Sequence, residues 1–221
     1  MKVFDNSGNS VKQSSLSTDE VKTTFAFEVA TDMSDNIFVL TRLRKLTELS
    51  YWVYKLTKTA DLHHRFRLRG EGWYSGLSVS DKVKVVTLRD CIVVEGYDTD
   101  GEFVRIFGQE RMKSAVDVTV VNDGCVMVLD QVDPCVHIFS ESGDYLDMLK
   151  LQQIDCDCMS ITFHRAGEQV IVAGSQVGKL LQVGIYSKEI TIDGGIRFKT
   201  RITVTTKGRI AYVANGKVFI F

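Results

Sequence analysis

The fold is decided by residues 115–149, AVDVTVVNDGCVMVLDQVDPCVHIFSESGDYLDML. Apolar and polar residues alternate there in four short runs, at 115–121, 125–130, 134–139 and 145–149. Each run has the two-residue period of a β-strand, and turn-forming Asn, Asp, Ser and Gly residues separate most of the runs. The stretch therefore predicts four antiparallel strands joined by short turns, which we denote a, b, c and d in chain order.

The same unit recurs along the chain. The residue that ends strand c recurs at Leu56, Tyr97 and Phe139, after 41 and 42 residues. Strand b recurs at 37–40, 84–87, 126–129, 170–173 and 211–214, at intervals of 41 to 47 residues. Four-stranded units at this period are typical of β-propeller blades, and the two-residue alternation excludes helical repeats. We therefore predict an all-β fold, a β-propeller of four-stranded blades.

About five blades are present in a single domain spanning residues 1–221. We place a partial blade at 1–17, complete blades at about 24–70, 74–110, 114–151 and 158–193, and a second partial blade at 200–221. The expected total is 21 strands. A five-bladed ring closed by the N-terminal strands would hold about 20, and a six-bladed ring about 24. We favour a fragment of a six-bladed ring over a divergent five-bladed closure.

Composition adds limits on the class of protein. The 221 residues are 44% hydrophobic and 25% charged, with a formal net charge of −1. Five scattered cysteines do not form a disulfide framework, which favours a reducing compartment. The sequence has neither an apolar run of about 18 residues nor a signal peptide. We expect a cytoplasmic protein with no membrane partner.

Residues 115–143 resemble an NHL repeat. A blade of that family starts with an apolar "GVAVD" strand, turns at "DGN", and continues with "IYVAD" and "VQVFD". The corresponding segments here are AVDV, NDG, VMVLD and VHIF, and residues 3–8 and 97–108 match the second half of the repeat. The sequence departs from the family where Val132-Asp133-Pro134 replaces the usual Asn-His-Arg. It also lacks the Gly-His and Trp-Asp pairing of WD40 repeats.

The resemblance implies a propeller like that at the C-terminus of tripartite-motif (TRIM-NHL) proteins. In those proteins one propeller face docks a protein or RNA partner. A full-length parent would carry an N-terminal RING and B-box and act as an E3 ubiquitin ligase. This chain would then supply substrate recognition, and the catalytic part would lie outside it.

Charge is distributed unevenly, both along the chain and between the two faces of the predicted ring. Because successive strands are antiparallel, the a–b and c–d turns share one face, the a–b face. The b–c turns and d–a links share the other, the b–c face. Residues 42–69 carry eight basic residues against two acidic ones, whereas residues 90–157 carry fifteen acidic residues against four basic ones.

The longest b–c connection, at residues 41–50, lies on the b–c face, and long loops on rigid scaffolds often bind partners. Several basic and aromatic residues gather near it. We predict the following partner-binding residues: Arg42, Arg44, Lys45, Arg69, Trp73, Tyr74 and Arg89. They suit a protein partner or single-stranded RNA. The alternative is that the charges are solvated surface and the aromatic residues are core.

Motifs for catalysis and metal binding are weak. Cys156-Asp157-Cys158 is an isolated cysteine pair, and the adjacent His63 and His64 point to opposite faces of a strand. Nucleophile, Walker and dinucleotide motifs are absent. We expect no enzyme, no catalytic residues, no metal, no cofactor and no small-molecule substrate. The alternative is a metal-dependent propeller lyase or hydrolase with a channel-centred site.

If the b–c face grips RNA, changing Arg42, Arg44 and Lys45 together to Glu will weaken the complex. Binding should also fall with rising salt, because phosphate contacts release counterions. Filter binding of single-stranded RNA at two salt concentrations measures both effects. Unchanged binding by the triple variant would remove this face as an RNA site.

Overall fold

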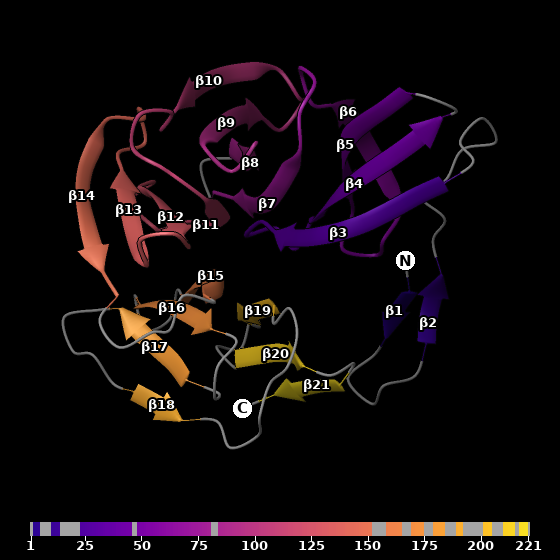
Figure 1. The fold of residues 1–221 in the computed structure, drawn as a ribbon. Helices are drawn as coiled ribbons and strands as arrows, with labels where there is room; N and C mark the ends of the chain where they lie inside the picture. The colour runs from indigo at the N-terminus through magenta and orange to yellow at the C-terminus, as the bar shows by residue number, and fades with distance from the viewer. Residues whose placement is uncertain are drawn as a thin grey trace.

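The computed structural model describes residues 2–4, 10–13, 23–45, 48–80, 84–151, 158–164, 169–174, 179–183, 189–191, 201–204, 210–214 and 217–220. Side chains are described at 25–44, 48–80, 84–151, 160–164 and 170–172. These residues form strands and turns, arranged as six antiparallel sheets in a ring (Figure 1). The described part of the chain contains no helix long and apolar enough to cross a membrane.

Four of the sheets are complete blades of four strands. The first contains β3 (Thr23–Thr31), β4 (Ile37–Lys45), β5 (Glu48–Leu56) and β6 (Leu62–Arg67). The second contains β7 (Tyr74–Val79), β8 (Lys84–Arg89), β9 (Val93–Asp98) and β10 (Phe103–Phe107). The third contains β11 (Ala115–Val120), β12 (Val126–Asp130), β13 (Cys135–Phe139) and β14 (Tyr145–Lys150). The fourth contains β15 (Cys158–His164), β16 (Gln169–Gly174), β17 (Lys179–Val183) and β18 (Glu189–Thr191).

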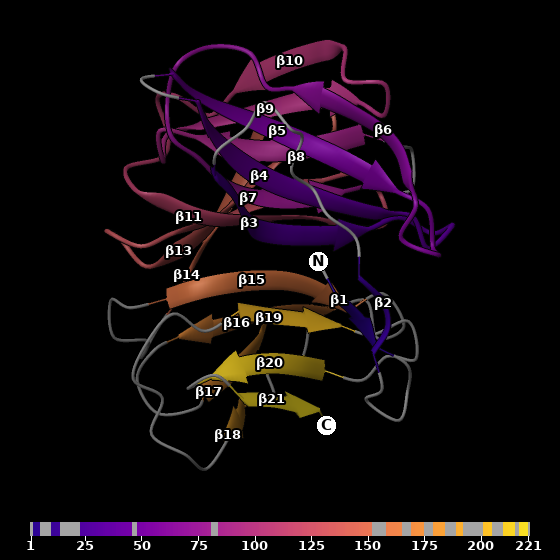
Figure 2. The ribbon, with the colours of Figure 1, turned by 90° about the vertical axis from the view of Figure 1, so that its right-hand side faces the viewer.

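Two smaller sheets complete the arrangement. One pairs β1 (Lys2–Phe4) with β2 (Ser10–Gln13). The other contains β19 (Arg201–Val204), β20 (Ile210–Ala214) and β21 (Lys217–Ile220). Figures 1 and 2 place β1 and β2 between the first complete blade and the β19–β21 sheet. A five-bladed closure would join β1 and β2 to the β19–β21 strands in one blade. In the structure these two groups of strands form separate sheets.

The predicted all-β propeller with about five blades is confirmed. The described residues form 21 strands, as the repeat predicts, and every neighbouring pair within a sheet is antiparallel. The inner strands β3, β7, β11, β15 and β19 surround the centre of the ring (Figure 1). The antiparallel order places the b–c turns and d–a links on one face, as predicted.

The hydrophobic core lies between blades. One cluster joins Phe38 and Val53 of the first complete blade to Tyr74 and Val85 of the second. A second cluster joins the second blade to the third, and another joins the third to the fourth. Because a sheet buries its apolar faces only against its neighbours, each blade depends on the next for stability.

The c–d turns add a second, recurring contact between blades. Gly101 and Gly143 occupy the left-handed region, with φ of 92° and 94°. A Cβ atom would lie 2.2 Å from Phe66 Cγ at Gly101 and 2.8 Å from Phe107 Cδ1 at Gly143. In both cases the aromatic ring belongs to strand d of the preceding blade. The glycine is therefore required both by the turn and by the close approach of the ring.

Polar side chains on the inner strands also join adjacent blades. The Asp117 carboxylate accepts hydrogen bonds from the Ser160 hydroxyl (2.8 Å) and the Ile161 backbone N–H (3.0 Å). One blade earlier, the Ser78 hydroxyl accepts a hydrogen bond from the Val120 N–H (3.0 Å). These buried contacts fix the position of one inner strand relative to the next.

Asp117→Ala should lower the free energy of unfolding by about 1–3 kcal/mol, because the buried Ile161 N–H and Ser160 hydroxyl lose their acceptor. Urea denaturation followed by tryptophan fluorescence measures the change. The exposed Asp100, in the turn between β9 and β10, provides the control. Asp100→Ala should change stability by less than about 0.5 kcal/mol. Equal losses in the two variants would show that the inner-strand contact contributes no more to the free energy of unfolding than an exposed turn residue does.

Candidate partner-binding face

The strands of the first complete blade extend further toward the b–c face than those of the next two blades. Strands β3, β4 and β5 have nine residues each, whereas β7–β9 and β11–β13 have five or six. Figure 1 draws β3 and β4 as long arrows at the upper right of the ring. Phe25 pairs with Arg42 and Arg42 with Tyr51, so the sheet continues past the level at which the other blades turn.

The prediction of a long loop at residues 41–50 is therefore wrong. Residues 41–45 belong to β4 and residues 48–50 to β5, and only 46 and 47 lie outside the described residues. Thr41 and Leu43 are buried, whereas Arg44 is exposed. Buried and exposed residues thus alternate with the two-residue period of a strand. In the sequence, the several basic residues of this segment made that period hard to recognise.

A cluster of rings surrounds Arg42 on this extension. The Arg42 guanidinium carbon lies 5.4 Å from the Phe25 ring centroid and 5.0 Å from that of Trp73. The Tyr51 ring meets Trp73 edge to face at 6.3 Å and lies 5.2 Å from Tyr74. Trp73 remains 53% exposed and Phe25 51% exposed. We call Phe25, Arg42, Tyr51 and Trp73 the Arg42–Trp73 cluster.

Trp73 is held in place through its backbone. Its N–H donates to Asp90 Oδ1 (2.8 Å), and its carbonyl accepts from the Asp90 N–H (2.7 Å). Asp90 and Cys91 have φ of 54° and 60°, as in the type I′ turns that join hairpin strands. Left-handed conformations of residues other than Gly cost free energy and cluster at functional sites. Here the turn brings the Asp90 carboxylate to the Trp73 N–H.

The buried Glu95 carboxylate binds Tyr74, which packs against Tyr51 of the Arg42–Trp73 cluster. Glu95 is 1% exposed, and its Oε1 lies 2.7 Å from Arg89 Nε. The Tyr74 hydroxyl donates to Glu95 Oε2 (2.9 Å), and the Tyr97 hydroxyl donates to the same oxygen. Tyr97 also accepts a hydrogen bond from the Arg69 N–H (3.2 Å). The network ties the link between β6 and β7, which carries Trp73, to the second complete blade.

Burial sets the protonation state of the three phenols. It raises the pKa of Tyr51, with Arg42 offsetting part of the increase. Burial, together with the Glu95 carboxylate, raises the pKa of Tyr74 and of Tyr97 well above the ordinary range. All three hydroxyls therefore stay protonated at neutral pH, and Tyr74 and Tyr97 remain donors to Glu95.

The structure brings several of the predicted binding residues together, in different roles. Arg42 and Trp73 are in contact at the surface, and Arg44 is exposed beside them on β4. Tyr74 and Arg89 are committed to Glu95. The Arg69 guanidinium carbon lies 3.9 Å from the Phe103 ring centroid. Lys45 ends β4, but its side chain lies outside the described residues.

Sequence reasoning missed three residues of this region. Phe25 and Phe27 are two residues apart at the start of the first complete blade, a spacing that places two rings on one face of a strand. Glu95 is a charged residue within an apolar run, a signal of a buried polar contact. Asp90 follows strand b directly, where a carboxylate commonly caps a turn.

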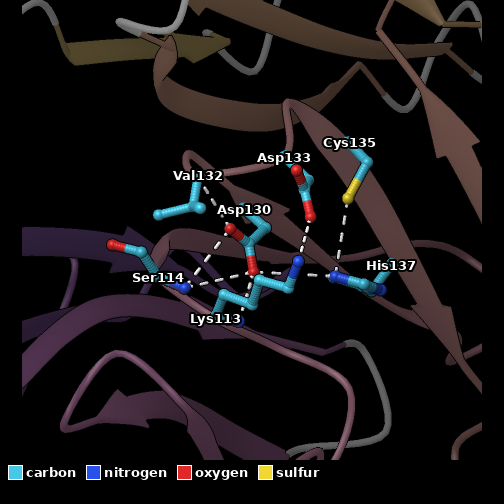
Figure 3. Close-up of polar contacts among 7 residues, drawn as sticks. All are labelled: Lys113, Ser114, Asp130, Val132, Asp133, Cys135 and His137. Carbon is cyan, nitrogen blue, oxygen red and sulfur yellow. Dashed lines mark hydrogen bonds and ion pairs between the residues drawn. The ribbon is translucent and has the colours of Figure 1, made fainter.

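A second polar cluster lies in the third complete blade (Figure 3). Asp130 accepts hydrogen bonds from the backbone N–H groups of Lys113 (2.6 Å), Ser114 (3.2 Å) and Val132 (3.0 Å). His137 Nε2 lies 3.7 Å from Asp130 Oδ2 and 3.5 Å from Cys135 Sγ. Cysteine, histidine and aspartate are also the residue types of a nucleophilic catalytic site.

Burial argues for a structural role of that cluster. Asp130, Cys135 and His137 are all buried. Burial raises the pKa of the Cys135 thiol to about 11 and lowers the pKa of His137. A nucleophilic cysteine needs the opposite shift and access to substrate. Asp130 instead organises the β12–β13 turn and the link that leads into β11.

Alkylation distinguishes these roles. With a pKa of about 11, roughly one Cys135 thiol in a thousand is ionised at pH 8. Iodoacetamide should therefore leave Cys135 unmodified in the native protein at pH 8, as measured by peptide mass spectrometry. The same treatment in urea, which exposes the thiol, should modify it fully. Rapid modification of the native protein at Cys135 would identify a reactive thiolate and contradict the structural role.

Metal-ligating residue types are dispersed in the described part of the chain. Among the residues whose side chains are described, no three His, Cys, Asp or Glu residues are grouped to hold a metal ion. Asp98 Oδ1 accepts the N–H groups of Asp100 and Glu102 at 2.9 Å, so its carboxylate closes a turn. Cys156 and the Cys158 side chain lie outside the described residues.

No protein-family model matches the sequence, and no curated protein matches it either. Solved structures do share its fold. A protein of unknown function from Bacteroides caccae has a TM-score of 0.62 and 12% identity, over 93% of this chain and 75% of that one. Virginiamycin B lyase from Staphylococcus aureus has a TM-score of 0.59 and 11% identity, over 92% and 85%. The Cps50 (Swd1) β-propeller domain from Myceliophteria thermophila has a TM-score of 0.58 and 14% identity, over 91% and 69%.

At such low identity these likenesses establish the β-propeller fold alone. They also correct one prediction. The expectation that the chain is not an enzyme is wrong, because a catalytic propeller, virginiamycin B lyase, shares its fold over most of its length. The physical reason is that a ring can assemble a site from residues of several blades, far apart in sequence. A missing local motif therefore does not exclude catalysis.

Proposed function

We propose that this β-propeller is a recognition module that binds a protein partner on its b–c face, at the Arg42–Trp73 cluster. The observation that carries the proposal is the half-exposed Trp73 ring, which is stacked on Arg42 and packed against Tyr51. Trp, Tyr and Arg are the residue types that contribute most to protein interfaces.

The rigidity of the cluster favours binding. The Trp73 backbone is fixed by two hydrogen bonds to Asp90, and its ring packs against Arg42 and Tyr51. The Tyr74 hydroxyl is bound to the buried Glu95. A side chain that is already ordered loses little conformational entropy when a partner covers it. The antiparallel extension of β3–β5 adds a stable platform next to it.

A narrower identity is part of the same proposal. The NHL type of the repeat and a tripartite-motif parent rest on the motif resemblance of residues 115–143. In such a parent the module would select the substrate of a ubiquitin ligase in the cytoplasm. RNA is the competing ligand for this face, and its binding would depend far more steeply on salt.

Peptide selection tests the proposal directly. Random 12-residue peptides displayed on phage are selected on the immobilised propeller, and the site of each selected peptide is mapped by hydrogen–deuterium exchange. Slowed exchange is expected at residues 42–51 and 68–74. Protection confined to the a–b face would contradict the proposal.

Trp73→Ala should weaken binding of the selected peptides by roughly 30-fold or more, the effect of removing an interface hot spot. Isothermal titration calorimetry measures the affinity. Met33→Ala is the matched control, because Met33 is 68% exposed in the β3–β4 turn on the opposite face. Equal affinity of the Trp73 variant and the wild type would remove the cluster as the anchor.

A channel-centred enzyme is the second candidate, favoured by the fold shared with virginiamycin B lyase. Stoichiometric zinc or calcium in protein purified without chelator, measured by plasma mass spectrometry, would support this metal-dependent alternative. Metal-free protein that binds peptides through Trp73 would favour recognition.

A further inference from the structure

Three basic side chains on the b–c face have carboxylate partners. Arg67 lies 3.0 Å from Glu48, Arg89 is paired with Glu95, and Lys113 is paired with Asp133. Among the residues with described side chains, Arg42, Arg44, Arg69 and Arg111 of this face have no such partner. Arg69 and Arg111 are each stacked on a ring of their own surroundings, Phe103 and Tyr145, whereas Arg42 and Arg44 lie next to each other on β4. Their positive charge is therefore uncompensated at the surface of the β3–β5 extension.

Arg42 is also prepared to receive an anion. The Phe25 and Trp73 rings fix the position of its guanidinium group. A guanidinium stacked on rings keeps N–H donors along its edge, and these bind a carboxylate in a bidentate manner. Because the side chain is already ordered, such a contact costs less entropy than one to a free arginine.

The two arginines share one side of the sheet. They are two residues apart on β4, so their side chains point the same way, about 7 Å apart along the strand. This is also the spacing of alternate residues in an extended peptide. Two carboxylates at alternate positions of an extended segment would therefore meet the two arginines in register.

Apolar side chains lie on the same side of the sheet. Phe25 pairs with Arg42, and Leu49, which is 46% exposed, pairs with Arg44. Directly paired residues of antiparallel strands project to the same side. With Trp73 they form an exposed apolar border around the two charges.

We infer that this surface binds an extended acidic segment of a protein partner, with carboxylates at alternate positions beside a bulky apolar residue. The carboxylates bind Arg42 and Arg44, and the apolar residue packs against Trp73. The inference rests on the proposed function and specifies the chemistry of its partner.

Synthetic peptides test the charge requirement. A fluorescein-labelled ten-residue peptide carries two glutamates at alternate positions and a phenylalanine on each side. Matched peptides replace the glutamates by glutamine or by lysine, or the phenylalanines by serine. Fluorescence anisotropy should show at least about tenfold tighter binding of the glutamate peptide than of the glutamine or lysine peptide.

Variants of the propeller test the residues. Arg44→Glu should weaken the glutamate peptide by about tenfold and improve binding of the lysine peptide. Lys58→Glu is the matched control, because Lys58 is exposed in the β5–β6 turn on the opposite face of the same blade. The control should bind like the wild type. Because Arg44 is exposed, its reversal should leave the urea midpoint unchanged.

The outcomes separate the two proposals. Selected peptides that need Trp73 but bind equally with glutamate or glutamine would overturn the acidic segment and leave the proposed function intact. Peptides that bind without Trp73 would overturn both. A uridine decanucleotide that outcompetes the glutamate peptide, and that Arg44→Glu releases, would overturn the protein segment in favour of RNA.

Discussion

The structure depends on the burial of each blade face against the next blade. A four-stranded sheet has apolar side chains on both faces and cannot bury them within itself. Phe38 and Val53 are fully buried only because Tyr74 and Val85 of the following blade pack against them. The same holds at the next two junctions. The turns and links that form the two faces of the ring contribute little to this burial, so their sequence and length can vary.

The candidate site lies where the repeat is broken. Strands β3–β5 exceed their counterparts by several residues, and the β8–β9 turn holds two left-handed residues, Asp90 and Cys91. Both departures bring the same side chain, Trp73, to the surface beside Arg42. Among the described turns, two consecutive left-handed residues other than glycine occur at Asp90 and Cys91, and such conformations cluster at functional sites.

The repeat in the sequence was sufficient to predict the blades, because alternation and turn residues are local signals. The packing around Glu95 was not predictable in this way. Its partner Tyr97 lies two residues away on the same strand, but Tyr74 and Arg89 lie on two other strands, and only the pairing of the sheet brings these to Glu95. For the same reason Arg89 was predicted to face a partner, since a sequence shows a charge but not the buried carboxylate that neutralises it.

Burial decides between the two polar clusters. The Asp130 carboxylate is satisfied by backbone donors, and Cys135 and His137 are enclosed with pKa shifts that oppose reactivity. Arg42, by contrast, combines a fixed position, partial exposure and no carboxylate partner among the described side chains. A group that is ordered before binding and still has donors to satisfy gains the most from a ligand. The Arg42–Trp73 cluster is therefore the surface that we propose for partner binding, whereas the Asp130 carboxylate organises a turn and a link of the third complete blade.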